Sequence, residues 1–92
     1  MKKHVIIFGK VQGVGFRYWL YEKAIKKNMR GFVKNRISGE VEALLIGTDA
    51  DVNDLIKQCK KNGPLSSNVK QVTIQDYKQE YSKKSFDILS SN

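Results

Sequence analysis

Hydrophobic and polar residues are arranged along the chain in seven segments with the periodicity of strands or helices. Five segments have the period-2 alternation or the short aliphatic runs that predict β-strands. Two segments have apolar residues three and four positions apart, which predicts amphipathic helices. The predicted strands are Lys3–Phe8, Phe32–Ile37, Val41–Ile46, Val69–Tyr77 and Phe86–Leu89, and the predicted helices are Phe16–Asn28 and Ala50–Lys61.

Turn residues separate these elements. Asn28 can adopt the left-handed conformation that ends a helix, and Ser38–Gly39 predicts a tight connection between two strands. Thr48 or Asp49 can cap the second helix, and Asn62–Pro64 is expected to end it. The order β-α-β-β-α-β, with one further short strand, predicts an α+β fold. We expect a ferredoxin-like βαββαβ sandwich, an antiparallel sheet with two helices on one face. Many functions share this fold, so it does not identify the function.

Length and composition favour one small domain over residues 1–92. The chain has 92 residues, 40% of them hydrophobic, and no repeat or linker interrupts them. Ser90–Asn92 is expected to be a loose tail. Cys59 is the single cysteine and cannot form an internal disulfide, which is typical of the reducing cytosol, so the predicted location is cytoplasmic. No apolar run approaches the about 20 residues that a membrane span needs, and the N-terminal apolar run is too short for a signal peptide.

Positive charge is high for a chain of this length. Its 17 lysines and arginines against 9 acidic residues give a formal net charge of +8. This balance attracts anions, whether small phosphates, nucleic acid or acidic membranes. A solvated lysine surface is the alternative interpretation of most of these residues.

The segment Gly9–Arg17 joins the first predicted strand to the first predicted helix and is rich in glycine. Glycine permits tight turns and close approach of the backbone to a ligand, and loop amides at a helix N-terminus favour an anion. Arg17 adds a planar guanidinium that can bind a phosphate through two parallel hydrogen bonds. The loop is no common nucleotide motif, because Tyr18 occupies the last glycine position of G-x-G-x-x-G and no Gly-Lys-Ser or Gly-Lys-Thr follows. Spacing alone leaves a phosphate site and an ordinary strand-to-helix turn equally open.

Asn35 is the second unusual residue. It shares one face of a predicted strand with Val33 and Ile37. Strands disfavour asparagine, and a buried asparagine needs partners for its carbonyl and both amide hydrogens. Asn35 therefore either forms hydrogen bonds with a loop at the end of the strand or orients a water or a substrate.

Taken together, these segments resemble the acylphosphatases. The runs that carry the resemblance are Gly9–Arg17, Gly31–Asn35, Gly39–Glu42 with Gly47, Gly63–Pro64 and Phe86–Ile88. They cover nearly the whole chain, and the run Val-Gln-Gly-Val-Gly-Phe-Arg is highly specific. Phe32 stands where the family often has tryptophan, and the tail beyond Ile88 is longer. Neither departure touches the expected site.

The resemblance implies a hydrolase that needs no metal and no cofactor. The implied reaction splits the carboxyl–phosphate bond of small acyl phosphates into a carboxylate and inorganic phosphate. Arg17 matches the family's phosphate-binding arginine, and Asn35 matches the asparagine that positions the attacking water, so these are the expected catalytic residues. The expected substrate-binding residues are Val11, Gln12, Gly13, Val14, Gly15, Phe16 and Arg17. A phosphate oxygen of the substrate is a plausible base, and the carboxylate is a good leaving group.

Two other functions stay open. An RNA-recognition domain has the same order of elements, but it carries aromatic residues on its central strands, whereas the predicted strand Val41–Ile46 has none. The other is an acylphosphatase-like module that binds carbamoyl phosphate for a larger enzyme. A 92-residue chain with both Arg17 and Asn35 favours a free-standing, monomeric enzyme. We therefore expect acyl phosphate and inorganic phosphate as partners, and neither nucleic acid nor membrane; His4 and Cys59 are interpreted as structural.

Overall fold

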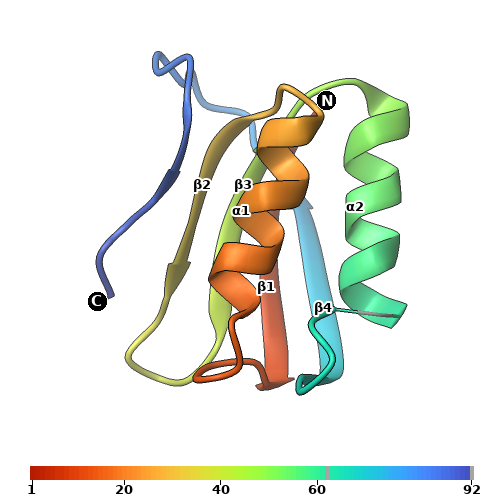
Figure 1. The fold of residues 1–92 in the computed structure, drawn as a ribbon. Coiled ribbons are helices and arrows are strands. Elements are labelled where there is room, and N and C mark those ends of the chain that lie inside the picture. Colours follow the sequence, from red (N-terminus) through yellow and green to blue (C-terminus); the bar gives the residue numbers. More distant parts are fainter. Residues whose placement is uncertain (62, 92) are drawn as a thin grey trace.

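Two helices cover one face of a five-stranded sheet in the computed structural model, which describes residues 1–61 and 63–91 (Figure 1). The elements follow the predicted order. They are β1 (Lys2–Lys10), α1 (Phe16–Lys26), β2 (Arg30–Asn35), β3 (Val41–Ile46), α2 (Asp49–Lys61), β4 (Asn68–Asp76) and β5 (Phe86–Ile88). This arrangement confirms the predicted ferredoxin-like α+β fold.

The strand order in the sheet is β4-β1-β3-β2-β5. The pairs β4–β1, β1–β3 and β3–β2 are antiparallel, as predicted. β5 differs, because it pairs parallel with β2 over Gly31 to Val33, so the sheet as a whole is mixed. The chain leaves β4 at one edge and must reach the opposite edge, and this crossover sets the parallel direction of β5.

The core lies between the helices and the sheet. Phe16, Leu20 and Ala24 are the buried residues of α1, which confirms the predicted stripe on this helix. They pack with Val5 and Ile7 of β1, both fully buried. Burying a leucine side chain such as that of Leu20 stabilises the folded state by about 2 kcal/mol. This packing fixes α1, and with it the loop that precedes α1, on the sheet.

Every element except β3 has a boundary that differs from the sequence prediction by one or two residues, and the differences in α1 and β2 are the most informative. α1 ends at Lys26, and Asn28 adopts the expected left-handed conformation with φ 55°. β2 runs two residues earlier than predicted, because it includes Arg30 and Gly31, and Ile37 is not part of it. Ile37 lies instead in the hairpin turn and is 84% exposed.

Of the two caps predicted for the second helix, Thr48 or Asp49, Thr48 fills this role, because its Oγ1 accepts a hydrogen bond of 3.1 Å from the amide of Asp51. Of the predicted stop at Asn62–Pro64, Asn62 lies outside the described residues. Gly63 has φ 40°, and its amide donates to the Gln58 carbonyl at 3.0 Å.

In the predicted tail, Asn92 also lies outside the described residues. No helix within residues 1–61 and 63–91 is long and apolar enough to cross a membrane.

Gly31→Ala tests the close approach of β2 to β3. Gly31 has φ 131°, and an added Cβ would collide with the Leu44 carbonyl oxygen and lie 2.8 Å from the Leu44 carbonyl carbon. Gly39 has φ 112° but open space at its Cβ position, so Gly39→Ala is the matched control. We expect urea unfolding to show a loss of about 3 kcal/mol or more for Gly31→Ala and of about 1–2 kcal/mol for Gly39→Ala. Equal losses of unfolding free energy in Gly31→Ala and Gly39→Ala would contradict the expected collision with the Leu44 backbone.

The Cys59 thiol gives a pH-dependent prediction. Burial raises the pKa of Cys59 from 9.0 to about 12. The unfolded chain therefore loses this proton first, so the contribution to stability is complete below pH 9 and is lost as the pH rises toward 12. In urea unfolding, we expect the free energy of unfolding to fall less between pH 9 and pH 11 for Cys59→Ala than for the parent chain. Rapid alkylation of the native thiol at pH 8 would contradict the burial.

Candidate active site

The loop between β1 and α1 reverses the chain within residues 11–15. Gly13 and Gly15 have φ 73° and φ 81°, values that side-chain-bearing residues rarely adopt. An added Cβ at either glycine would meet nothing within 4 Å, so the backbone conformation and not lack of space requires glycine there. Val11 and Phe16 flank the loop, and each is 1% exposed. The loop is thus pinned at both ends, with open space beside its two glycines.

The N-terminus of α1 carries no cap of its own. Gly15 is the N-cap residue in the left-handed conformation, and within the described part of the chain no side chain forms a cap hydrogen bond there. The first turn of α1 contains no acidic residue, whereas α2 has Asp49 and Asp51 in its first turn and Thr48 as its cap. The first amides of a helix have no partner within the helix and carry partial positive charge. α1 therefore presents these donors to an anion, and α2 does not.

Arg17 lies in the first turn of α1 and is partly exposed. In residues 1–61 and 63–91, no salt bridge or side-chain hydrogen bond engages its guanidinium. Its five donors are available to a ligand at the same helix end. A small anion bound there would meet both the helix amides and a fixed positive charge.

Asn35 reaches the same place from the sheet. It is the last residue of β2 and faces the helices, as does the fully buried Val33 two residues earlier. Its Oδ1 atom is buried and has no hydrogen-bond partner among the described residues. An unpartnered buried acceptor is unfavourable unless a water or ligand donates to it. Asn35 thus offers an acceptor beside the loop.

A small pocket of about 90 Å³ brings these features together. Its lining residues are Val11, Gly13, Gly15, Phe16, Arg17, Tyr18 and Asn35. The volume suits a small anion and is far below that of typical pockets for larger ligands. Two expected substrate-binding residues do not line it: Val14 packs against the core, and the Gln12 side chain donates hydrogen bonds to the β2–β3 hairpin. Their backbone amides still belong to the loop.

Tyr18 lines the pocket although it was not expected as a site residue. Its side chain is 65% exposed. The only signal in the sequence was its place directly after Arg17, in the first turn of the helix. The pocket thus includes the first turn of α1 beyond Arg17.

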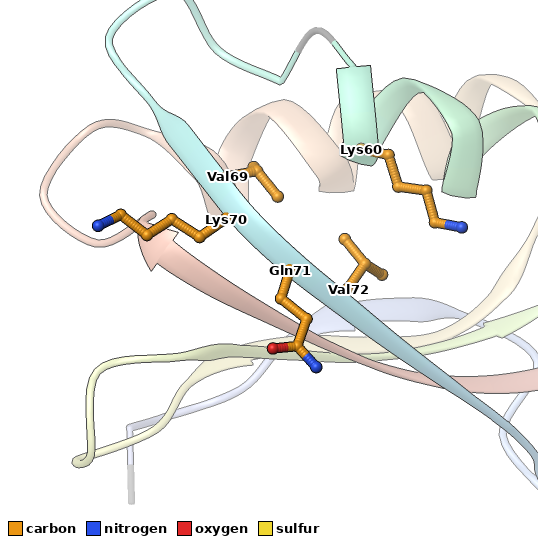
Figure 2. A pocket seen from close by; sticks show the side chains of 5 residues that line it. All are labelled: Lys60, Val69, Lys70, Gln71 and Val72. Carbon is orange, nitrogen blue, oxygen red and sulfur yellow. The ribbon is translucent and has the colours of Figure 1, made fainter.

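A larger pocket of about 200 Å³ lies between α2 and β4 and contains two lysines. Figure 2 shows Val69 and Val72 directed toward α2, while the amino groups of Lys60 and Lys70 point away from each other. Two cations that diverge do not hold one anion between them. This pocket therefore lacks the convergence of the loop site.

His4 is paired on the opposite face of the sheet. Its Nε2 lies 2.7 Å from Glu42 Oε2, and Glu42 is also 3.9 Å from the Lys34 ammonium and 3.8 Å from the Arg36 guanidinium. Within the described ranges, no group of three or more His, Cys, Asp and Glu side chains is placed to hold a metal ion. His4 is thus hydrogen-bonded to a carboxylate that also pairs with Lys34 and Arg36.

Comparison with known proteins points to one family. The acylphosphatase family model matches residues 3–88. An acylphosphatase of Moorella thermoacetica is 36% identical over 91 residues, which cover 99% of this chain and 96% of the relative. An acylphosphatase of Rhodopseudomonas palustris is 37% identical over 94 residues, with 97% and 94% covered.

Solved structures agree with these matches. The crystal structure of acylphosphatase from Bacillus subtilis superposes with a TM-score of 0.89 at 33% identity, covering 96% of this chain and 97% of that one. A structure of full-length HypF in a phosphate- and nucleotide-bound form has a TM-score of 0.86 at 32% identity. It is covered over only 12% of its length, against 98% of this chain.

Proposed function

Because the chain belongs to the acylphosphatase family, enzymes that hydrolyse acyl phosphates, we propose that residues 11–17 and Asn35 form its catalytic site. The substrates are small acyl phosphates, and the products are a carboxylate and inorganic phosphate. The observation that carries this assignment is one pocket that joins the uncapped N-terminus of α1, the Arg17 side chain and the buried Asn35 Oδ1.

The loop and Arg17 bind the phosphoryl group. Amides of the loop and of the first turn of α1 donate to its oxygens, and the Arg17 guanidinium adds charge-assisted hydrogen bonds. Phosphoryl transfer passes through a loose transition state with charge spread over the oxygens of phosphorus. Donors already fixed around those oxygens stabilise this charge without having to reorganise during the reaction.

Asn35 positions the attacking water. Its buried Oδ1 accepts a hydrogen bond from a water, which directs an oxygen lone pair of that water toward phosphorus. Holding the water and the phosphoryl group in one pocket lowers the entropic part of the barrier. The water's proton passes to a phosphate oxygen of the substrate, and the carboxylate leaves without a proton from the enzyme.

We further propose a metal-independent reaction in a cytoplasmic monomer, with no nucleic acid or membrane as partner. The second candidate is a module that binds carbamoyl phosphate for a larger enzyme. The likeness to a segment of the longer HypF supports a module within a larger protein, whereas coverage of 96% of the Moorella thermoacetica relative favours the hydrolase. Both candidates use the same phosphate site, and turnover distinguishes them.

The proposed function predicts turnover by the purified chain alone. It should hydrolyse acetyl phosphate and benzoyl phosphate, and excess EDTA should leave the rate unchanged. Release of inorganic phosphate and loss of benzoyl phosphate absorbance measure this directly. Phosphate binding without turnover would favour the binding module. Loss of activity in EDTA would contradict the metal-independent reaction.

Arg17→Ala and Asn35→Ala should separate binding from turnover. Without the guanidinium, we expect kcat/KM to fall about 10³-fold and inhibition by inorganic phosphate to weaken strongly. Without the Asn35 amide, kcat should fall about 10²-fold while the inhibition constant of phosphate stays nearly unchanged. Steady-state kinetics with phosphate as the inhibitor measures both constants.

Lys26→Ala is the matched control for charge, because it removes one cation from the other end of α1. This variant should keep the parent kinetics. If Asn35→Ala retained full turnover, the role of Asn35 toward water would be wrong. If Lys26→Ala were as impaired as Arg17→Ala, general attraction of anions would replace specific binding by Arg17.

A further inference from the structure

Gln12 connects the phosphate loop to the hairpin that follows Asn35. Its Nε2 donates to the carbonyl oxygens of Arg36 at 2.7 Å and Glu40 at 2.9 Å, and both bonds are partly buried. The two acceptors lie 24 and 28 residues further along the chain. One side-chain amide thus uses both of its hydrogens to join two parts of the site that are distant in sequence.

The two acceptors are the carbonyls that close the hairpin turn. The Arg36 carbonyl accepts the Gly39 amide at 3.0 Å, and the Glu40 carbonyl accepts the Arg36 amide at 2.9 Å. Arg36 directly follows Asn35, and Glu40 directly precedes Val41, the residue paired with Asn35 across the two strands. Gln12 therefore binds both arms of the hairpin, on the turn side of the Asn35–Val41 pair.

Among residues 1–61 and 63–91, the side chains of Arg36 and Ser38 interact within the hairpin itself. Arg36 pairs with Glu40 at 3.7 Å and with Glu42 at 3.8 Å, and the Ser38 hydroxyl donates to Glu40. In the described part of the chain, Gln12 makes the side-chain hydrogen bonds that link residues 11–15 to the hairpin. These hydrogen bonds join the phosphate loop directly to Arg36, the residue that follows Asn35.

We infer that Gln12 is a positioning residue, which sets the distance and angle between the phosphoryl group in the loop and the water on Asn35. The inference rests on the proposed function. The backbone of Gln12 belongs to the phosphate loop, and its side chain holds the hairpin that follows Asn35. Gln12 therefore couples the binding of the phosphoryl group to the positioning of the water. A water displaced by about 1 Å can reduce the rate by about 10²-fold. The phosphate loop itself is pinned by Val11 and Phe16 and should still bind phosphate without this link.

Gln12→Met tests this role, because methionine has similar length but no hydrogen to donate. We expect kcat to fall about 10- to 100-fold, while the inhibition constant of inorganic phosphate changes less than about threefold. Gln12→Asn, one methylene shorter and unable to reach both carbonyls, is the second variant and should show the same split. It keeps the test available if Gln12→Met does not fold.

Arg30→Met is the matched control. Arg30 Nη1 also donates to two backbone carbonyls, of Tyr81 and Lys83, both at 2.9 Å, but from the opposite end of β2. It should lose stability to an extent similar to Gln12→Met in urea unfolding and keep the parent kcat. A kcat loss in Arg30→Met equal to that of Gln12→Met would make the Gln12 effect a general loss of stability and overturn the inference.

A double-mutant cycle with Asn35→Ala shows whether Gln12 acts through Asn35. If it does, adding Gln12→Met to Asn35→Ala should lower kcat by less than about twofold more. Multiplication of the two separate losses would overturn the inference, as would an unchanged kcat in Gln12→Met. Neither result would touch the proposed function, which fails only if the parent chain does not hydrolyse acyl phosphates.

Discussion

The reversal of the chain between β1 and α1 is the constraint on which the site depends. Val11 and Phe16 are buried on either side of it, so the loop between them has one path. That path requires positive φ at Gly13 and Gly15, and it leaves the first amides of α1 without a cap. Burial of two apolar side chains thereby fixes a set of unpaired donors at the protein surface, where an anion can satisfy them.

The other half of the site comes from the middle of the chain. Pairing of β2 with β3 places Asn35 at the end of its strand, and the core packing of α1 places Arg17 above it. Both contributions rest on the same hydrophobic core, which includes Phe16 of α1 and Val33 of β2. The Gln12 amide spans the loop and the hairpin, and its hydrogen bonds give them a common frame. The same hydrogen bonds therefore hold the loop against the hairpin and, in the proposed mechanism, position the water.

Sequence reasoning identified what local pattern determines. The buried stripe of Phe16, Leu20 and Ala24 follows from helical spacing. The tight turn in residues 11–15 follows from its glycines, because glycine adopts the positive φ angles found there. The resemblance to acylphosphatases supplied roles for Arg17 and Asn35, and the structure places both beside one pocket. The roles themselves stay predictions.

Other features depend on contacts that no local pattern encodes. The predicted strand began at Phe32, but β2 also includes Gly31, which pairs with β3 where the Leu44 backbone leaves no room for a side chain. Ile37 alternated correctly for a strand, yet the hairpin bonds between Arg36 and Glu40 place it in a turn. The Gln12 side chain was expected only as part of the loop, since its acceptors are distant in sequence. Contacts distant in sequence decided the features at Gly31 and Gln12, whereas the local bonds of the hairpin turn decided the place of Ile37.

The central claim is that a water held by Asn35 attacks phosphorus in the loop site. Hydrolysis of acetyl phosphate by the purified chain in H₂¹⁸O, with mass analysis of both products, tests it most directly. The account predicts that the label enters inorganic phosphate and that the carboxylate stays unlabelled. Label in the carboxylate would mean attack at the carbonyl carbon and would contradict the assigned roles of the loop, Arg17 and Asn35.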